Sequence, residues 1–287
     1  MDWLNAIQHI LTRIEENIQD PDLGIESLSN ELFISAPHLQ RAFSVLTQTS
    51  VSEYIRNRRL SLAATALHEG QSIIQTALQF GYESPEAFAK AFKRFHGVTP
   101  SEVKTKNVSL IAYPPLQIQI TLKGEEPMNY TLVDKPGFTL IGTSIEVSTE
   151  HDENMKRIPA FWNEISQNGI LEKITALPNI KEITGAGIMD CANATSFTYA
   201  AAGMFDTPTE APPEFSKWEV GPQTWAIFEA VGTMPQAIQA VWLRIFSEWF
   251  PATGFEHANA PELEVYPPGD TTADDYRCEI WIPVIKK

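Results

Sequence analysis

The sequence predicts two domains: an all-α N-terminal domain with a double helix-turn-helix, and an α+β C-terminal domain. The second domain is expected to contain duplicated strand-helix-strand-strand units around an antiparallel sheet. Three observations lead to this prediction: the first third has helical periodicity and repeats itself once, the periodicity stops near residue 107, and apolar and polar residues alternate thereafter. We therefore place the domains at residues 1–107 and 108–287.

The helical third contains one pattern twice. Residues 24–54 and 73–103 align at an offset of 49 without a gap, and both carry apolar residues at i, i+3, i+4 and i+7. In each copy a serine, Ser35 or Ser84, stands where it can cap a helix that has a proline in its first turn. A shorter amphipathic helix precedes each serine. This order predicts two helix-turn-helix units, although a plain helical bundle is the alternative.

Polar side chains occupy the side of each capped helix that faces away from the apolar stripe. Glutamine and arginine can read adenine and guanine edges in the major groove, and basic side chains can contact phosphates. The predicted DNA-binding residues are His38, Gln40, Arg41, Ser44, Arg56, Arg58, Arg59, Glu86, Ala87, Lys90, Lys93 and Arg94. For each arginine, an ordinary solvated helix face is the alternative.

The helical third resembles the AraC-type DNA-binding domain, most specifically in the run GYESPEAFAKAFKRFHGVTPSEV. The resemblance implies two helix-turn-helix units joined by a long helix, here over residues 51–69. It also implies that both recognition helices enter successive major grooves on one face of the DNA. Carried over by position, Gln40 and Arg41 are readers in the first unit, and Glu86, Ala87 and Lys90 occupy the corresponding face of the second.

Charge is distributed unevenly between the two parts. The whole chain has a net charge of −15, but residues 1–107 contribute −2 and residues 108–287 contribute −13. The acidic excess therefore lies outside the predicted DNA-binding domain, and the asymmetry predicts different partners for the two domains.

The second domain is expected to begin with a hairpin of residues 116–122 and 128–133. Two strand-helix-strand-strand units then follow. Strands are predicted at 138–147, 182–190, 197–205, 224–231, 262–266 and 276–284, with helices at 152–167 and 235–249; the Pro-rich residues 206–218 are expected to form a rim. Two such units side by side create a cleft at their junction, which is a usual place for a ligand.

This part resembles the GyrI-like effector-binding domain. The resemblance rests on PMNYTLVDKPGFTLIG, on WAIFEAVGTMPQAIQAVWLRIFSEWFP and, most strongly, on PELEVYPPGDTTADDYRCEIWIPV. It implies a sensor of small lipophilic, often cationic, molecules with a buried acidic residue in an aromatic pocket. The order of the two domains resembles the Rob-like subset of bacterial regulators.

Two carboxylates compete for the role of pocket acid. Alternation places Glu279 beside Trp281 on one face of the last strand, while the opposite face is apolar and should pack on a helix. A carboxylate beside aromatic rings suits a bulky cation, so Glu279 is the first candidate and Glu264 is its rival. The other predicted ligand-binding residues are Trp281, Tyr266, Trp225, Tyr199, Phe205 and Trp218. Tryptophans on helix stripes, such as Trp162 and Trp242, are expected to pack in the core.

Other classes of site find little support in the sequence. Two cysteines without a CxxC pair exclude a cysteine-rich zinc site, the six histidines are scattered, and no cofactor or catalytic motif is present. We expect a cytoplasmic chain without a signal peptide or membrane span. The predicted function is a sequence-specific transcription regulator, not an enzyme, whose partners are double-stranded DNA and a lipophilic, cationic effector, with RNA polymerase as an open third partner. The alternatives are a small-molecule hydrolase or a protein-docking module tethered to the DNA-binding head.

Overall fold

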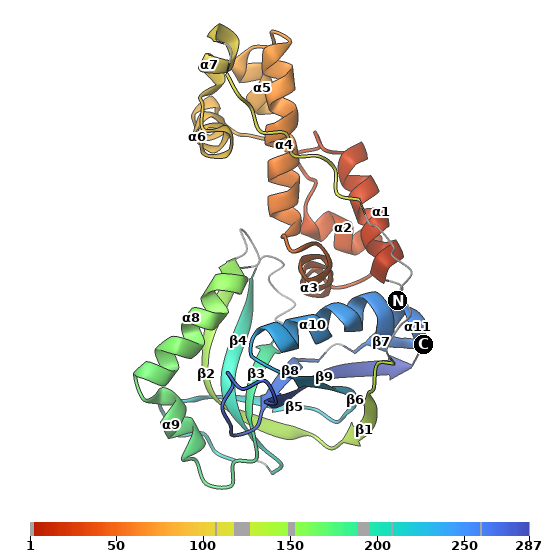
Figure 1. Ribbon diagram of the computed structural model, residues 1–287, viewed down its shortest axis with the longest axis vertical. Helices are drawn as coiled ribbons and strands as arrows, with labels where there is room; N and C mark the ends of the chain where they lie inside the picture. The colour runs from red at the N-terminus through yellow and green to blue at the C-terminus, as the bar shows by residue number, and fades with distance from the viewer. Residues whose placement is uncertain are drawn as a thin grey trace. The chain divides into compact units, whose positions relative to one another are not determined.

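The computed structural model describes residues 3–106, 108–117, 127–148, 153–188, 196–207, 209–258 and 260–286. The chain divides into two compact units (Figure 1). The helical unit comprises Asn5–Ile120, and the sheet unit comprises Thr121–Lys287 with Met1–Leu4. No described helix is long and apolar enough to cross a membrane.

The helical unit has the double helix-turn-helix that the repeat predicts. Its helices are α1 (Trp3–Glu16), α2 (Ile25–Glu31), α3 (Ala36–Thr47), α4 (Val51–His68), α5 (Ile73–Gln79), α6 (Pro85–His96) and α7 (Pro100–Thr105). α2–α3 and α5–α6 are the two units, and α4 joins them. Ser84 caps α6 by accepting a hydrogen bond from the Ala87 N–H at 3.1 Å, whereas Ser35 makes no side-chain cap hydrogen bond at α3.

The two turns differ in length, so the gapless alignment of the repeat is wrong. In the first turn the Ile34 N–H donates to the Ser29 carbonyl, and in the second the Tyr82 N–H donates to the Ala77 carbonyl. Ser29 and Ala77, which make these matching bonds, are equivalent residues before the two turns. Their separation in the sequence is one residue shorter than that of Ser35 and Ser84, the equivalent residues after the turns. Glu83 is therefore an additional residue in the second turn.

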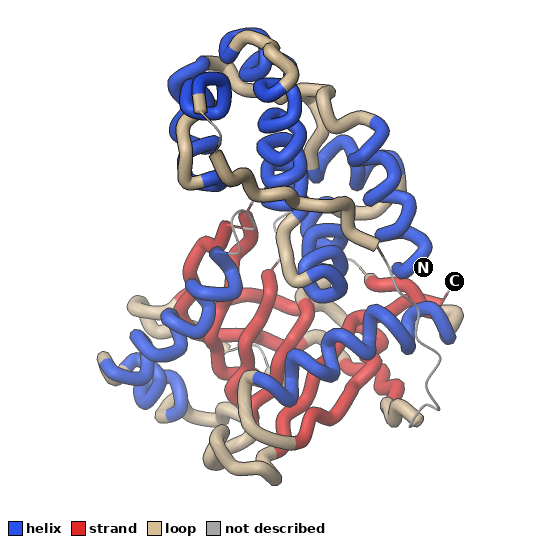
Figure 2. Tube along the Cα trace, turned by 45° about the horizontal axis from the view of Figure 1, so that its top comes forward, coloured by secondary structure: helices blue, strands red, loops and turns tan. Residues whose placement is uncertain are grey.

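An extended segment follows α7 and runs back along α4 (Figures 1 and 2). We call residues 108–117 the strap. Its N–H groups donate to His96 Nδ1 from Ile111 (3.1 Å), to Ser61 Oγ from Tyr113 (2.9 Å) and to Tyr54 Oη from Leu116 (3.2 Å). These acceptors lie on α6 and along α4, so the strap belongs to the helical unit, which continues past the predicted boundary at 107.

The sheet unit contains one antiparallel sheet. Its strands are β1 (Thr131–Lys135), β2 (Phe138–Ser148), β3 (Ile183–Ile188), β4 (Ser196–Phe205), β5 (Ser216–Val220), β6 (Gln223–Val231), β7 (Phe255–His257), β8 (Glu262–Tyr266) and β9 (Arg277–Lys286). Its helices are α8 (Glu153–Gln167), α9 (Ile170–Thr175), α10 (Gln236–Arg244), the π-helix η2 (Ile245–Trp249) and α11 (Phe250–Ala252).

The strand order shows the predicted duplication. The order is β1-β6-β9-β8-β3-β4-β2-β5, with β7 paired to β9. The units β2-α8-β3-β4 and β6-α10-β8-β9 each place their third strand between the first and the second, and they meet where β3 pairs with β8. Residues that face each other across β3 and β8 therefore lie at the junction of the two units.

The two faces of the sheet have different neighbours. α8 and α10 lie across one face, which we call the helix face (Figure 2). The other face carries a core that includes Phe138, Trp225 and Trp281. Phe138 on β2 and Trp225 on β6 have ring centroids 5.9 Å apart, although β6 and β2 are the second and seventh strands of the order. The sheet therefore curves around this core, and we call that side the concave face.

The predicted hairpin is the main departure in this unit. Residues 118–126 lie outside the described residues, residues 116 and 117 belong to the strap, and β1 pairs with β6. β5 is a short edge strand at the end of the segment that was expected to form a rim. The prolines and acidic residues of that segment are typical of a loop, so the strand was not predicted.

Candidate functional site

Glu264 lies at the junction of the two duplicated units. Alternation along β8 sends Glu264 and Tyr266 to the helix face and Leu263 and Val265 to the concave face, where both are buried in the core. The β3–β8 register places Gly185 directly opposite Glu264. The carboxylate thus projects beneath α8 and α10 at the middle of the sheet.

Three neutral donors hold the Glu264 carboxylate. The Trp242 indole N–H from α10 donates to Oε1 at 2.8 Å, and the hydroxyl of Tyr266 donates to Oε2 at 3.0 Å. Tyr199 on β4 donates to the same Oε2 through a longer bond of 3.4 Å. Together these donors fix the orientation of the carboxylate.

Trp162 completes an aromatic group around this carboxylate. Its indole N–H donates to Tyr199 Oη at 3.0 Å, and its ring meets that of Tyr266 edge-on at a centroid distance of 5.6 Å. We call Glu264, Tyr266, Tyr199, Trp162 and Trp242 the Glu264 cluster. Tyr199 and Trp242 are buried, whereas the other three are half-buried, so the cluster is partly open to solvent.

A glycine makes room for this arrangement. A Cβ atom at Gly185 would lie 2.2 Å from Tyr199 Oη and 3.4 Å from Trp162 Cζ2. Only a residue without a side chain lets the Tyr199 ring lie across β3 and reach Glu264. At Gly187, on the same face, nothing lies within 4 Å of such an atom. The close approach is therefore specific to Gly185.

Two titratable groups near Glu264, the Tyr266 hydroxyl and the Cys278 thiol, stay protonated. Burial and the Glu264 carboxylate raise the pKa of Tyr266 well above its usual value, so its hydroxyl remains a donor. Burial, aided by Glu264 and Glu279, raises the pKa of Cys278 to about 12. A thiol with this pKa is not a nucleophile at neutral pH. The cluster thus offers one carboxylate and aromatic rings, which suits binding of a cation through charge and cation–π contact.

Tyr266, Tyr199 and Glu264 are predicted ligand residues that the structure brings together. Trp162 and Trp242 were expected to be core residues, and both reach the same cluster. They hold equivalent positions in the duplicated helix pattern: Trp162 follows Phe161 as Trp242 follows Val241. This pairing of tryptophans at the junction of two repeats was a signal in the sequence that pointed to the site.

The remaining predicted ligand residues lie elsewhere, and Glu279, the first candidate for the pocket acid, is one of them. Glu279 pairs with Val265 and so points to the concave face, where it accepts a hydrogen bond from the Trp281 indole at 2.7 Å. The Lys135 ammonium lies 4.2 Å from the Trp281 ring centroid, so the chain's own cation already covers that ring.

Three further aromatic residues are also separated from Glu264. Trp225 is fully buried in the concave-face core, and Trp218 packs against that core. Phe205 is on the helix face but lies six residues beyond Tyr199 on β4, about 20 Å away along the strand. These three side chains have packing roles in the sheet unit.

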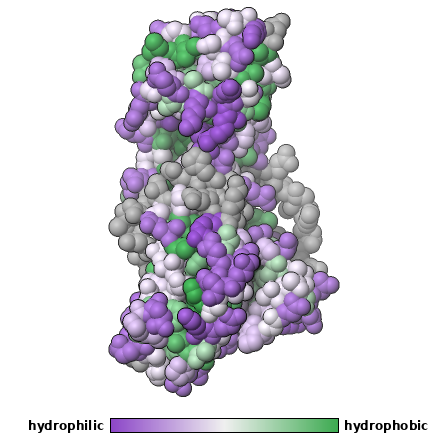
Figure 3. Space-filling view, turned by 90° about the vertical axis from the view of Figure 1, so that its left-hand side faces the viewer, coloured by the Kyte–Doolittle hydropathy of each residue, from purple (hydrophilic) through white to green (hydrophobic). Residues whose placement is uncertain are grey.

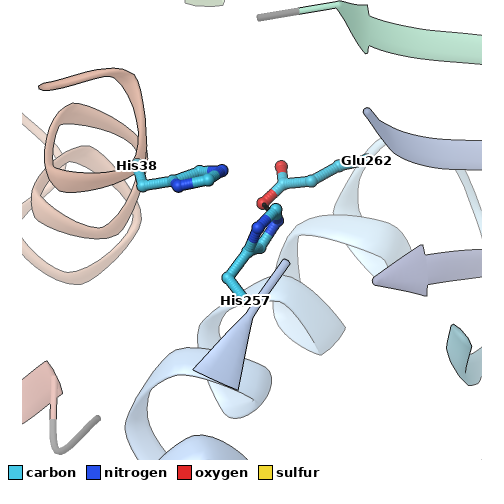
Figure 4. A group of neighbouring side chains, drawn as sticks. All are labelled: His38, His257 and Glu262. Atoms are coloured by element: carbon cyan, nitrogen blue, oxygen red, sulfur yellow. Dashed lines mark ion pairs between the residues drawn. The ribbon is translucent and has the colours of Figure 1, made fainter. Parts of the chain in front are cut away.

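A histidine–carboxylate pair lies close to the cluster on β7 and β8. His257 Nε2 and Glu262 Oε1 are 3.0 Å apart, and both side chains are buried (Figure 4). Glu262 is two residues before Glu264, so the pair lies at the start of the strand that carries the pocket candidate. Figure 4 also labels His38, a predicted DNA-binding residue on α3 of the helical unit.

The second helix-turn-helix presents the predicted polar face. Phe88, Phe92 and His96 bury one side of α6. The opposite side is exposed and carries Glu86, Ala87, Lys90, Lys93 and Arg94. Hydrophilic side chains gather on this side of the helical unit (Figure 3). Three basic groups within two turns form a surface that can contact phosphates.

Several predicted DNA contacts of the first unit and of α4 are engaged inside the helical unit, which corrects their assignment. Gln40 does not point away from the fold: its amide donates to Ser44 Oγ at 2.7 Å and accepts from the Val51 N–H at 3.4 Å. It thus links α3 to the first turn of α4. Both groups on Gln40 that could read a base are occupied.

The arginines of α4 have structural partners. Arg58 is buried, pairs with Glu15 at 2.6 Å and donates to the Tyr113 carbonyl of the strap. Arg59 donates to the carbonyls of Ile18 and Asp20, and Arg56 pairs with Glu53. Spacing could not reveal the roles of Arg58 and Arg59, because their partners are distant in sequence.

Comparison with known proteins gives two family matches. A model described as "Integron-associated effector binding protein" matches residues 131–284, and one described as "Helix-turn-helix domain" matches residues 28–106. Right origin-binding protein of Escherichia coli K12 is 26% identical over 300 residues, covering 99% of both chains. Multiple antibiotic resistance protein MarA of Salmonella typhimurium is 34% identical over 104 residues, covering 36% of this chain and 81% of MarA. Among solved structures, SAV2435 bound to tetraphenylphosphonium has a TM-score of 0.49 and 24% identity, covering 55% of this chain and 94% of its own.

Proposed function

Because this chain belongs to the AraC-type transcription regulators that carry a GyrI-like, integron-associated effector-binding domain, we propose that it senses a lipophilic cation at the Glu264 cluster. Its helical unit binds DNA, its sheet unit binds a small-molecule effector, and it is a regulator rather than an enzyme. The effector class and the residues that hold it form the proposal. A DNA partner favours the cytoplasm as its location.

One observation carries the proposal: a half-buried carboxylate lies among four aromatic side chains at the junction of the two duplicated units. Glu264 supplies the charge, and the half-buried rings of Trp162 and Tyr266 supply apolar and π surface. Trp242 and Tyr199 fix the carboxylate by hydrogen bonds. A bulky organic cation is bound both by charge attraction to Glu264 and by contact with the rings. A neutral or anionic molecule of the same shape lacks the charge attraction.

For DNA, we propose that the exposed face of α6 supplies phosphate and groove contacts. Lys90, Lys93 and Arg94 lie on that face. Gln40 on α3 and Arg58 on α4 are excluded as contacts, because their polar groups are used within the fold. Loss of one phosphate contact should reduce the salt dependence of binding by about one counterion.

The two alternatives to a sensor fare differently. The hydrolase alternative is not supported, because the relatives are regulators and the buried thiol of Cys278 stays protonated. For the docking module, nothing specific among the described residues favours a protein partner.

A matched pair of ions tests the cation proposal. Tetraphenylarsonium and tetraphenylborate have nearly the same size and shape but opposite charge. Trp162 and Trp242 belong to the cluster, so binding to the full chain should change its tryptophan fluorescence. We expect saturable binding of the cation and at least about tenfold weaker binding of the anion. Equal affinities would show that apolar surface alone is recognised and would refute the role of Glu264.

A further inference from the structure

Phe33 is unusual in the helical unit because a bulky apolar residue there has both a positive φ and an exposed side chain. It lies in the turn between α2 and α3, with φ at 56° and a side chain that is 96% exposed. A positive φ is rare for a bulky residue and costs conformational free energy, because Cβ approaches the following carbonyl oxygen. An almost fully exposed phenyl ring gains nothing from burial. Neither the backbone nor the core of this unit therefore favours phenylalanine here.

The second helix-turn-helix shows what the fold itself prefers at this position. Phe33 and Gly81 are equivalent, because their N–H groups donate to Asn30 and Leu78, the matching carbonyls of the two turns. Gly81 has φ at 79°, and a Cβ atom there would lie 2.9 Å from Arg59 Nη1. Glycine meets the conformational requirement of this turn without strain. The first turn has the same backbone conformation but keeps an aromatic ring and exposes it.

The location of the ring indicates what it meets. Phe33 stands two residues before Ser35, the residue that precedes α3. In a bound helix-turn-helix, the first residues of the recognition helix contact base edges, and the preceding helix crosses the phosphate backbone. The turn between them therefore faces the wall of the groove. Apolar groups near this turn are the deoxyribose of the wall and the thymine methyl at the edge of the groove floor, and phenylalanine can pack on them.

We propose that Phe33 is an apolar DNA contact of the first helix-turn-helix unit and that its strained backbone is retained for this contact. The inference rests on DNA binding by this chain but adds a residue that is neither basic nor on a recognition helix. It also gives the first unit a means of contact that does not use Gln40.

The substitution Phe33→Gly tests this directly, because it should move stability and DNA affinity in opposite directions. Glycine relieves the backbone strain, so the melting temperature should rise. The affinity for a duplex selected by the wild-type chain from a random-sequence pool should fall about tenfold, as expected for loss of a partly buried ring. The slope of log affinity against log salt should stay unchanged, because no charge is removed.

Three further variants serve as controls. Phe33→Leu keeps an apolar side chain and should retain most of the affinity. Leu243→Ala removes an exposed leucine from the sheet unit and should leave DNA affinity unchanged. Lys90→Ala should weaken binding and lower the salt slope by about one.

The outcomes separate this inference from the proposed DNA face. A higher melting temperature with unchanged DNA affinity for Phe33→Gly would overturn the inference, as would a lower melting temperature, which would show that the ring supports the fold. If Lys90→Ala weakens binding and Phe33→Gly does not, the inference fails and the proposed face of α6 stands. If Phe33→Gly weakens binding and Lys90→Ala does not, the α6 face fails and the Phe33 contact stands.

Discussion

Glu264 and Glu279 form a natural comparison. They lie on the neighbouring strands β8 and β9, both are half-buried, and each accepts a hydrogen bond from an indole N–H, at 2.8 and 2.7 Å. Yet Glu279 pairs with Val265, the residue after Glu264, so the two carboxylates point to opposite faces of the sheet. Because side chains alternate between the two faces of a sheet, a shift of one residue in the pairing gives Glu264 and Glu279 different neighbours.

The neighbours make the difference. Glu264 lies beneath α8 and α10 with two tyrosine donors, whereas Glu279 lies on the side where Lys135 covers the Trp281 ring. A carboxylate beside a tryptophan is therefore not by itself a cation receptor.

The largest effect is expected from Gly185→Ala. The new Cβ would lie 2.2 Å from Tyr199 Oη, so the tyrosine must move away from Glu264. We expect overpacking to lower the free energy of unfolding by about 1–3 kcal/mol and to abolish most cation binding. Urea unfolding and titration with tetraphenylarsonium measure the two effects.

Gly187→Ala is the matched control for Gly185→Ala. Both glycines lie on the same face of β3, but nothing lies within 4 Å of a Cβ at Gly187. It should bind the cation nearly as the wild type does. Equal losses in the two variants would mean that β3, rather than the Tyr199 contact, is sensitive to substitution.

The next effect concerns the two indole donors. Trp242→Phe removes the 2.8 Å bond to Glu264 and should weaken cation binding about three- to tenfold, because the carboxylate loses an orienting donor. Trp281→Phe removes the corresponding bond to Glu279 and should leave cation affinity unchanged, even if the core is destabilised. Titration calorimetry at equal fractions of folded protein compares the two.

Tyr266→Phe should have a smaller effect, visible mainly at high pH. The pKa of Tyr266 is raised in the folded chain, so its protonated form is favoured by folding. The stability linked to this group is present below the ordinary tyrosine pKa near 10 and is lost as the pH rises above it. Unfolding experiments should therefore show a shallower loss of stability above pH 10 in the variant. If the unfolding free energies of the wild type and the variant changed in parallel above pH 10, this would contradict the raised pKa of Tyr266.

The smallest expected effect concerns Cys278, whose thiol should not react with a thiol reagent in the native chain. Its pKa of about 12 and its complete burial predict negligible modification by a thiol reagent at pH 8 in the native chain. A Cys191→Ser background isolates the signal, and urea-unfolded protein provides the positive control. Rapid native modification would show that the interior near Glu264 opens readily.

The sequence predicted most elements of the fold because their signals are local. Helical stripes located α2, α3, α5 and α6, the family resemblance implied the long helix α4, and alternation located β2, β4, β6, β8 and β9. The gapless repeat failed because Phe33 takes a left-handed conformation that normally indicates glycine, so the turn position went unnoticed. The strap was missed because its stability comes from hydrogen bonds to Tyr54, Ser61 and His96, all distant in sequence.

The candidate site was predicted only in part, because alternation along a strand is a local signal and the order of the strands is not. Alternation assigned the residues of β9 to their faces correctly, with Cys278, Ile280 and Ile282 toward the helices. The sequence favoured a pocket on the face opposite the helices, whereas we propose one on the helix face. Strand order was needed to see that Glu264 faces Gly185 at the junction of the repeats, and that Trp162 and Trp242 reach it from two helices.

The central claim is that Glu264, and not Glu279, is the receptor for a cation. Titration calorimetry of tetraphenylarsonium into Glu264→Gln and Glu279→Gln tests it most directly, because both changes remove one charge at nearly constant shape. The account predicts a loss of about tenfold or more in affinity for Glu264→Gln and less than about twofold for Glu279→Gln. The reverse order, or equal losses, would contradict it.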